Sequence, residues 1–226
     1  MTPPRAAQDG KPMTAAGFAR ATGVSRETMQ RLEAYGALLE KWNRRINLVS
    51  RASLADLWRR HMLDSAQIID HIPASCRRLL DFGSGAGFPG LLVAMLGVEG
   101  VELIESDGRN CAFLAEAARV AGVSVIIHNC RIEDLTPFPA DVITARACAP
   151  LVKLCRYAAP FWGPRTRLIA LKGAHIDEEL TEATKYWIIE AERYPSLTDP
   201  KATVLCIRRL QYDKKSGQDA SRSGIT

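Results

Sequence analysis

The chain has 226 residues and a mass of 24.8 kDa, the size of one domain with room for a helical extension. Hydrophobic residues make up 47% and charged residues 24% of the chain, which excludes a disordered chain, a collagen-like fibre and a small disulfide scaffold. The net charge of +5 is compatible with a nucleic-acid partner but does not establish one.

We expect a cytoplasmic protein with reduced thiols. The first residues lack the apolar run of a signal peptide, and no apolar run is long enough to span a membrane. None of the six cysteines forms a C-x-x-C pair and the four histidines are scattered, so no metal site is expected.

Two amphipathic helices are predicted in the first third of the chain. Residues 25–46 carry one apolar stripe at spacings of three and four, and residues 53–71 carry a second. We therefore assign residues 17–75 to a helical segment that packs on the following domain. Residues 1–16 and 211–226 lack a hydrophobic period and are predicted to be disordered tails.

Residues 76–210 alternate short β-type runs with helical patterns, which favours a parallel sheet with helices on both faces. The last two runs are separated by Pro-Ser-Leu-Thr-Asp-Pro-Lys, a loop of turn residues, so they form a hairpin and at least one strand is antiparallel. The predicted strands lie at 78–82, 101–105, 123–127, 141–145, 167–172, 185–194 and 202–210.

The most informative segment is the glycine-rich turn Asp-Phe-Gly-Ser-Gly-Ala-Gly-Phe-Pro-Gly at residues 81–90. It follows a predicted strand and opens a predicted helix, and its glycines allow the backbone to approach a ligand closely. Part of it matches G-x-G-x-x-G, the dinucleotide pattern. Glu105 ends the next strand, where a carboxylate accepts hydrogen bonds from ribose hydroxyls. We therefore expect an adenosine-containing cofactor across these strand ends.

Asp81 discriminates between the possible cofactors. A carboxylate just before the glycines repels a pyrophosphate but attracts the ammonium and sulfonium groups of S-adenosylmethionine. This position favours a methyltransferase over an NAD-dependent oxidoreductase, the class that G-x-G-x-x-G alone would suggest.

Six ordered elements between about residues 40 and 175 resemble the bacterial small-subunit rRNA guanine-N7 methyltransferases, formerly called glucose-inhibited division protein B. In chain order they are W-N and I-N-L at 42–48, R-H-M-L-D-S at 60–65, the glycine turn at 81–90, E-S and F-L at 105–114, A-R-A at 145–147 and L-K-G at 171–173.

The resemblance implies a doubly wound, Rossmann-like class I methyltransferase fold (an α/β fold) behind N-terminal helices. Its seven-stranded sheet is mostly parallel, with an antiparallel last strand. The implied reaction is S-adenosylmethionine-dependent methylation of guanine N7 in the 530 loop of 16S rRNA, at position 527 in the usual rRNA numbering. Carried over by position, the family's cofactor contacts fall on Gly83, Phe88, Ile132, Glu133 and Arg146. The chemistry of the glycine turn and of the strand-end acids, argued above, adds Asp81, Gly85 and Glu105 to this cofactor-binding set.

Guanine N7 has a lone pair and no proton, so direct in-line methyl transfer needs no general base. We therefore assign no catalytic residue and attribute the acceleration to proximity and orientation. The chain lacks the Asp- or Asn-Pro-Pro-aromatic tetrad of amine methylation, and Cys148 is interpreted as structural rather than nucleophilic.

Three basic residues near the predicted site are candidates for rRNA contacts: Lys172, Arg60 and Arg146. The expected partner is 16S rRNA or the small ribosomal subunit, with the chain acting as a monomer away from membranes. Besides the oxidoreductase, two alternatives stay open at this point: a non-catalytic RNA-binding module and a methyltransferase of another RNA specificity.

Overall fold

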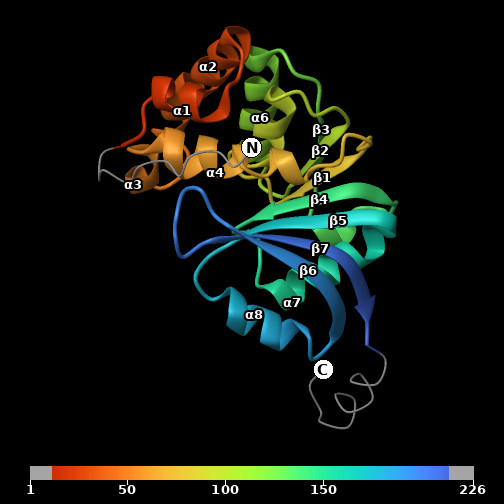
Figure 1. The fold of residues 1–226 in the computed structure, drawn as a ribbon. Helices are drawn as coiled ribbons and strands as arrows, with labels where there is room; N and C mark the ends of the chain where they lie inside the picture. The colour runs from red at the N-terminus through yellow and green to blue at the C-terminus, as the bar shows by residue number, and fades with distance from the viewer. Residues whose placement is uncertain (1–11, 214–226) are drawn as a thin grey trace.

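The computed structural model describes residues 12–213, built around one seven-stranded sheet with strand order β3-β2-β1-β4-β5-β7-β6 (Figure 1). The strands are β1 (Leu79–Phe82), β2 (Val101–Glu105), β3 (Ile126–Asn129), β4 (Ala140–Arg146), β5 (Trp162–Lys172), β6 (Trp187–Pro195) and β7 (Thr203–Tyr212).

Strands β1 to β5 run parallel, and β7 is antiparallel to both of its neighbours, β5 and β6. This confirms the expected seven-stranded, mostly parallel sheet with an antiparallel last strand. Every residue of β1 and β2 is buried, because helices cover both faces of the sheet. The strand order reverses between β1 and β4, and ligands of open α/β sheets bind in the crevice outside the strand ends at such a point.

The helices form two layers, each with its own apolar core. Helices α5 (Gly90–Met95) and α6 (Gly108–Ala121) cover one face together with the N-terminal helices. Helices α7 (Leu151–Ala158) and α8 (Ile176–Ala183) cover the other face, as Figure 1 shows. Two short 3-10 turns, η3 (Ile132–Asp134) and η4 (Ala159–Phe161), follow β3 and α7.

The N-terminal helical region is more broken than its sequence suggests. It contains α1 (Ala15–Thr22), α2 (Arg26–Asn43), α3 (Arg51–Leu54), the π-helical turn η1 (Trp58–Leu63), α4 (Asp64–Ala66) and the 3-10 turn η2 (Ile69–His71). The first predicted helix is present as α2. The prediction of one continuous helix over residues 53–71 is wrong, because this region is divided into several short helical segments. The wider π turn buries His61, Met62 and Leu63 in succession, which a regular amphipathic helix does not do.

The predicted tails extend too far at both ends. Thr14 caps α1, and the backbone N–H of Met13 donates to Asp56 at 2.7 Å, so the chain is ordered before residue 16. Strand β7 continues to Tyr212, past the expected boundary at 210. The remaining tail residues, 1–11 and 214–226, lie outside the described part of the chain.

No helix among residues 12–213 has both the length and the apolar character that a bilayer crossing requires. Within the same residues, no three His, Cys, Asp or Glu side chains gather as a metal site would need.

Candidate active site

The glycine turn connects β1 to α5 at the switch point of the sheet. Gly85 has a φ of 54°, and a Cβ added there would meet only the Gly83 carbonyl oxygen, at 3.9 Å, so this side of the turn is open. Gly90 has the opposite surroundings, because an added Cβ would lie 2.5 Å from the Cβ of Asp81. The turn therefore packs tightly onto β1 with one face and leaves backbone accessible to a ligand on the other.

Glu105 holds the open side of this turn in place. Its Oε2 accepts a hydrogen bond from the Gly85 N–H at 2.8 Å, and its Oε1 accepts one from the Asp107 N–H at 2.8 Å. Each carboxylate oxygen can accept more than one hydrogen bond, so capacity remains for two ribose hydroxyls. The structure thus adds a second role for Glu105, as the brace between the glycine turn and the start of α6.

Asp81 lies beneath the turn and has no exposed surface. Its Oδ1 accepts a hydrogen bond from the Thr144 hydroxyl at 2.7 Å, whereas its Oδ2 is buried without a hydrogen-bond partner among the described residues. Burial raises the pKa of Asp81 to about 6, so the carboxyl is mostly ionised at pH 7. A buried, mostly ionised carboxylate under the turn suits a cationic ligand group and opposes a pyrophosphate.

The expected cofactor residues come together at the carboxyl ends of four neighbouring strands. Ile132 and Glu133 lie in η3 after β3, Glu105 ends β2, the glycine turn follows β1, and Arg146 ends β4. Ile132 is buried and Glu133 is exposed. These neighbours fit one elongated ligand laid across the sheet edge.

Phe88 supports this edge from within. Its ring is 3% exposed and stacks on the His61 ring at 5.0 Å between centroids, with the Arg146 guanidinium 5.1 Å from its centroid. Tyr35 of α2 also packs on this ring, at 5.5 Å, and donates a hydrogen bond to the Ala86 carbonyl in the glycine turn. Phe88 therefore packs between the turn and the N-terminal helices.

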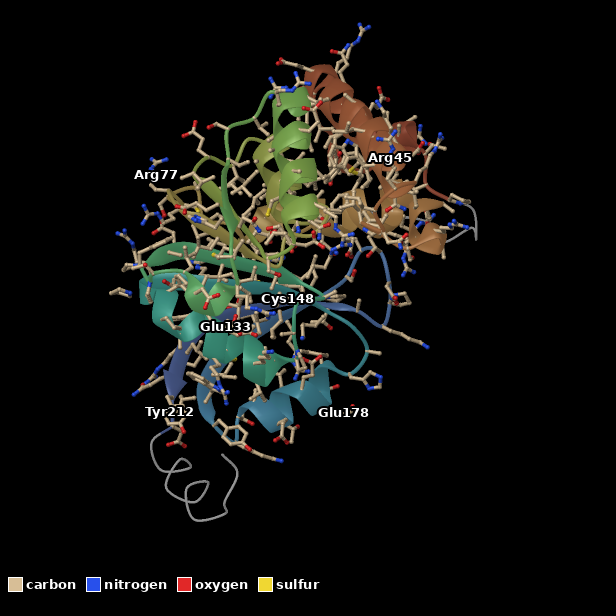
Figure 2. The ribbon with its side chains drawn as sticks, turned by 180° about the vertical axis from the view of Figure 1, so that it is seen from behind. Arg45, Arg77, Glu133, Cys148, Glu178 and Tyr212 are labelled. Carbon is tan, nitrogen blue, oxygen red and sulfur yellow. The ribbon has the colours of Figure 1, made fainter. Side chains whose placement is uncertain are left out.

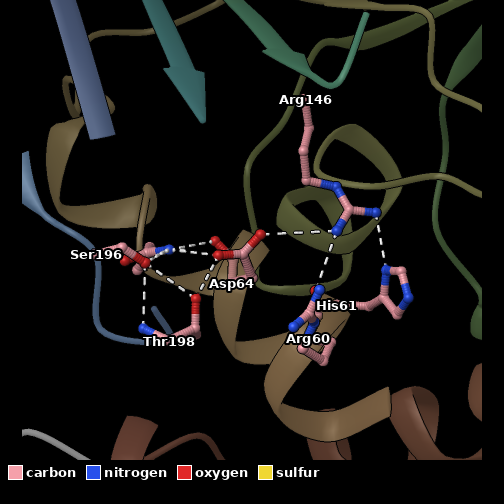
Figure 3. A network of polar contacts seen from close by, with 7 residues as sticks. Arg60, His61, Asp64, Arg146, Ser196 and Thr198 are labelled. Carbon is pink, nitrogen blue, oxygen red and sulfur yellow. Dashed lines mark hydrogen bonds and ion pairs between the residues drawn. The ribbon is translucent and has the colours of Figure 1, made fainter. Parts of the chain in front are cut away.

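Arg146 extends from β4 toward the N-terminal helices, as Figure 3 shows. Its guanidinium donates to the Arg60 carbonyl at 3.1 Å and lies 2.9 Å from His61 Nδ1. Because a guanidinium only donates, His61 Nδ1 must be the acceptor and the proton sits on Nε2. Burial and the charges of Arg146 and Arg60 lower the pKa of His61 to about 3, so the ring is neutral.

A cleft of about 780 Å³ opens beside this edge, between the ends of β4 and β5, the η1–α4 segment and the β6–β7 loop. Cys148 belongs to its lining and adjoins the glycine turn, because a Cβ added at Gly83 would lie 3.1 Å from its sulfur. Figure 2 shows Cys148 near the middle of the molecule, between the two helical layers. Burial raises the pKa of the Cys148 thiol to about 11, which leaves it a poor nucleophile near neutral pH.

Three comparisons with known proteins bear on what this edge does. The family model described as rRNA small subunit methyltransferase G matches residues 28–205. The chain belongs to this family. It is 53% identical over 198 residues to the ribosomal RNA small subunit methyltransferase G of Rhodospirillum rubrum, covering 88% of this chain and 98% of the relative. The enzyme of the same name from Paramagnetospirillum magneticum is 51% identical over 84% of this chain and 92% of its own length.

Solved structures show the same fold at low sequence identity. A ribosomal protein L11 methylase from Lactobacillus delbrueckii subsp. bulgaricus aligns with a TM-score of 0.53 at 17% identity, over 64% of this chain and 76% of that one. A TehB-like SAM-dependent methyltransferase from Corynebacterium glutamicum aligns with a TM-score of 0.50 at 16% identity, over 76% and 98%.

Membership in the methyltransferase G family confirms the resemblance, the enzyme class and the Rossmann-like methyltransferase fold that the sequence predicts. The cofactor is S-adenosylmethionine and the reaction class is methylation of small-subunit rRNA. The open side of the glycine turn, the free acceptor capacity of Glu105 and the buried carboxylate of Asp81 fit this cofactor.

One expected rRNA contact of this methyltransferase G family member, Lys172, has partners within the fold. Lys172 is not a free cation, because its ammonium lies 2.6 Å from Glu179 Oε2 and donates to the Ala149 carbonyl at 3.1 Å. Its side chain is 9% exposed, and Glu179 also accepts from the Leu151 N–H. Lys172 therefore holds the loop after β4 against α8. Arg60 differs, since it is exposed, lines the cleft and has no ion pair among residues 12–213.

Sequence reasoning did not connect Arg146 with the residues that surround it. Asp64, Gln67, Ser196 and Thr198 form one hydrogen-bonded group, although they come from two segments about 130 residues apart, and Asp64 of this group forms an ion pair with Arg146 at 3.7 Å. The R-H-M-L-D-S element contains His61 and Asp64 and was the one available signal. Nothing in the local pattern of the β6–β7 loop indicates that it contacts this element.

Proposed function

We propose that this chain methylates N7 of a guanine in the 530 loop of 16S rRNA, at position 527. The observation that carries the acceptor assignment is the state of four ionisable side chains that line the cleft, His61, Cys148, Asp64 and Glu179. The pKa of His61 is lowered to about 3 and that of Cys148 is raised to about 11, so neither exchanges a proton near neutrality. The carboxylates of Asp64 and Glu179 are held by partners within the fold. Such a cleft suits an acceptor that already carries a lone pair.

Residues along the four strand ends would hold the cofactor. Glu105 offers acceptors to the ribose, the Gly83 and Gly85 backbone lines the approach, and Asp81 supplies negative charge beneath the turn. Ile132 and Glu133 lie farther along the edge, where an adenine would extend. Bound S-adenosylmethionine supplies a methyl group on a positively charged sulfur.

The remaining residues orient the RNA. Arg60 and Arg146 line the cleft, and Arg44, Arg45 and Arg51 of the N-terminal helical region are exposed without ion pairs in the described part of the chain. These cations suit the phosphates that flank an unstacked base. Holding the acceptor nitrogen in line contributes on the order of 7–11 kcal/mol, and no side chain has to remove a proton.

The test is single-turnover methyl transfer to small subunits that carry either guanine or 7-deazaguanine at position 527. The analogue replaces N7 by carbon, so we expect transfer to guanine alone. Cys148→Ala is the matched control and should keep the parent rate, because no covalent step uses its thiol. Transfer to the analogue would refute N7 as the acceptor and favour another RNA specificity.

We further propose that the chain acts as a cytoplasmic monomer in which the N-terminal helical segment forms one unit with the sheet domain. The packing of α2 and η1 on the glycine turn supports this unit. Sedimentation of the free protein and of its complex with small subunits would reveal any stable dimer.

A further inference from the structure

Arg146 forms no close ion pair with a carboxylate of the described residues. Two of its neighbours are neutral, namely the Arg60 carbonyl and the His61 imidazole. The third is the Asp64 carboxylate, whose Oδ2 lies 3.7 Å from the guanidinium, beyond hydrogen-bond distance. Arginine and carboxylate groups favour shorter, bidentate pairs, so something must hold Asp64 back.

The other oxygen of Asp64 supplies the reason. Its Oδ1 accepts a hydrogen bond from the Thr198 hydroxyl at 2.6 Å and another from the Gln67 amide at 2.9 Å (Figure 3). Gln67 is in turn fixed by the β6–β7 loop, because its Oε1 accepts from the Leu197 N–H at 2.8 Å. Two donors on one oxygen fix the plane of the carboxylate and draw its charge away from the guanidinium.

We propose that Thr198 is a positioning residue, whose hydroxyl restrains Asp64 so that Arg146 keeps its positive charge available to an oxyanion bound at the cleft. The oxyanion is a carboxylate or a phosphate, and the proposal rests on the function proposed above, in which both groups reach this edge. Burial raises the pKa of Asp64, and the Thr198 hydrogen bond and the charge of Arg146 both oppose that rise.

Without the Thr198 hydroxyl, only the Gln67 amide holds Oδ1 of Asp64, and the carboxylate can turn more easily to form a short pair with Arg146. The guanidinium would then be neutralised from within the protein, and an external oxyanion would have to displace Asp64. The fold itself would remain, because Gln67 and Leu197 keep the loop attached.

The experiment compares Thr198→Val, which removes the hydroxyl and keeps the side-chain shape, with Thr198→Ser, which keeps the hydroxyl. Thr166→Val is the matched control, because it also removes a buried threonine hydroxyl, which donates to the Ala140 carbonyl. Thr166 lies in β5, six residues before the cleft end of that strand. Dissociation constants are measured for S-adenosylmethionine, for adenosine and for 16S rRNA over a range of salt concentrations. Thermal unfolding verifies that each variant is folded, and Thr198→Ala replaces Thr198→Val if that variant is not.

We expect Thr198→Val to weaken one oxyanion ligand by about tenfold, the effect of one charge-assisted hydrogen bond. If Arg146 holds the methionine carboxylate, S-adenosylmethionine weakens and adenosine does not. If it holds a phosphate, rRNA weakens and the salt slope of binding falls by about one unit. Thr198→Ser and Thr166→Val should match the parent. In an Asp64→Asn background Thr198→Val should have no effect, because a neutral amide does not capture the guanidinium.

Unchanged affinities for all three ligands in folded Thr198→Val would overturn the positioning role. So would an equal loss in Thr198→Ser, or a loss that persists in the Asp64→Asn background. Methyl transfer by the parent is measured in the same series. A parent that transfers no methyl group to small subunits contradicts the proposed function instead, which keeps the two failures distinguishable.

Discussion

Replacing Asp81 by asparagine is expected to flatten the pH dependence of stability. Asp81 is fully buried, and burial raises its pKa from 3.8 to about 6. A carboxyl whose pKa is raised by folding stabilises the fold below the unfolded-state pKa and loses that contribution as pH rises through the folded-state pKa. This rise in the pKa of Asp81 corresponds to about 3 kcal/mol in total, and about half of that free energy falls between pH 5 and pH 7.5.

The assay is urea denaturation of the parent and of Asp81→Asn at about pH 5 and pH 7.5. The free energy of unfolding of the parent should fall by about 1.5 kcal/mol relative to the variant between the two conditions. Other titrating groups are common to both proteins and cancel in this comparison. A difference that stays constant with pH would refute the argument that an ionised Asp81 is held in the core.

The same substitution should weaken S-adenosylmethionine more than adenosine, because the carboxylate acts on the cationic methionine end, which adenosine lacks. Equal losses for both ligands would contradict this role. The buried charge would then be a burden on stability with no function in binding.

Two other side chains give separate predictions. Glu105→Ala should raise the dissociation constants of S-adenosylmethionine and adenosine alike by at least about tenfold, because each charged hydrogen bond to the shared ribose contributes about 1.5–3 kcal/mol. Calorimetry measures both dissociation constants. An unchanged dissociation constant would contradict the assignment of Glu105 to the ribose. Lys172→Met should lower the free energy of unfolding by about 2 kcal/mol, since it leaves Glu179 unpaired. Its rRNA salt slope should match that of the parent; a lower slope with unchanged stability would restore Lys172 as a phosphate contact.

Local patterns predicted the parts of the fold that depend on local physics. The glycine turn, the acid at the end of β2 and the alternation of strands and helices are all visible along the chain. Helix α8 was missed, although Ile176, Leu180 and Ala183 have helical spacing and three acids occupy its first turn. The stripe is short, and the helix forms because it packs against α7 and β5, which is a tertiary effect.

The sequence predicted those parts of the candidate site whose residues lie together in one segment, such as the glycine turn. The pairing of Lys172 with Glu179 depends on how α8 folds back, and the bond between Asp64 and Thr198 joins residues 134 positions apart. No periodicity encodes such contacts. The π turn at η1 is a further case, because it is a local distortion stabilised by the partners that His61 finds in Arg146 and Phe88.

The hydrogen bond from Tyr35 to the Ala86 carbonyl has a consequence for protein engineering. It joins helix α2, which precedes the sheet, to the backbone of the glycine turn. The helical segment and the catalytic domain therefore cannot be exchanged independently at the boundary between them. A chimera joined near residue 75 would pair one parent's Tyr35, with its packing on Phe88 and Phe113, with the other parent's turn. Recombination between relatives should therefore keep α2 and the glycine turn from the same parent.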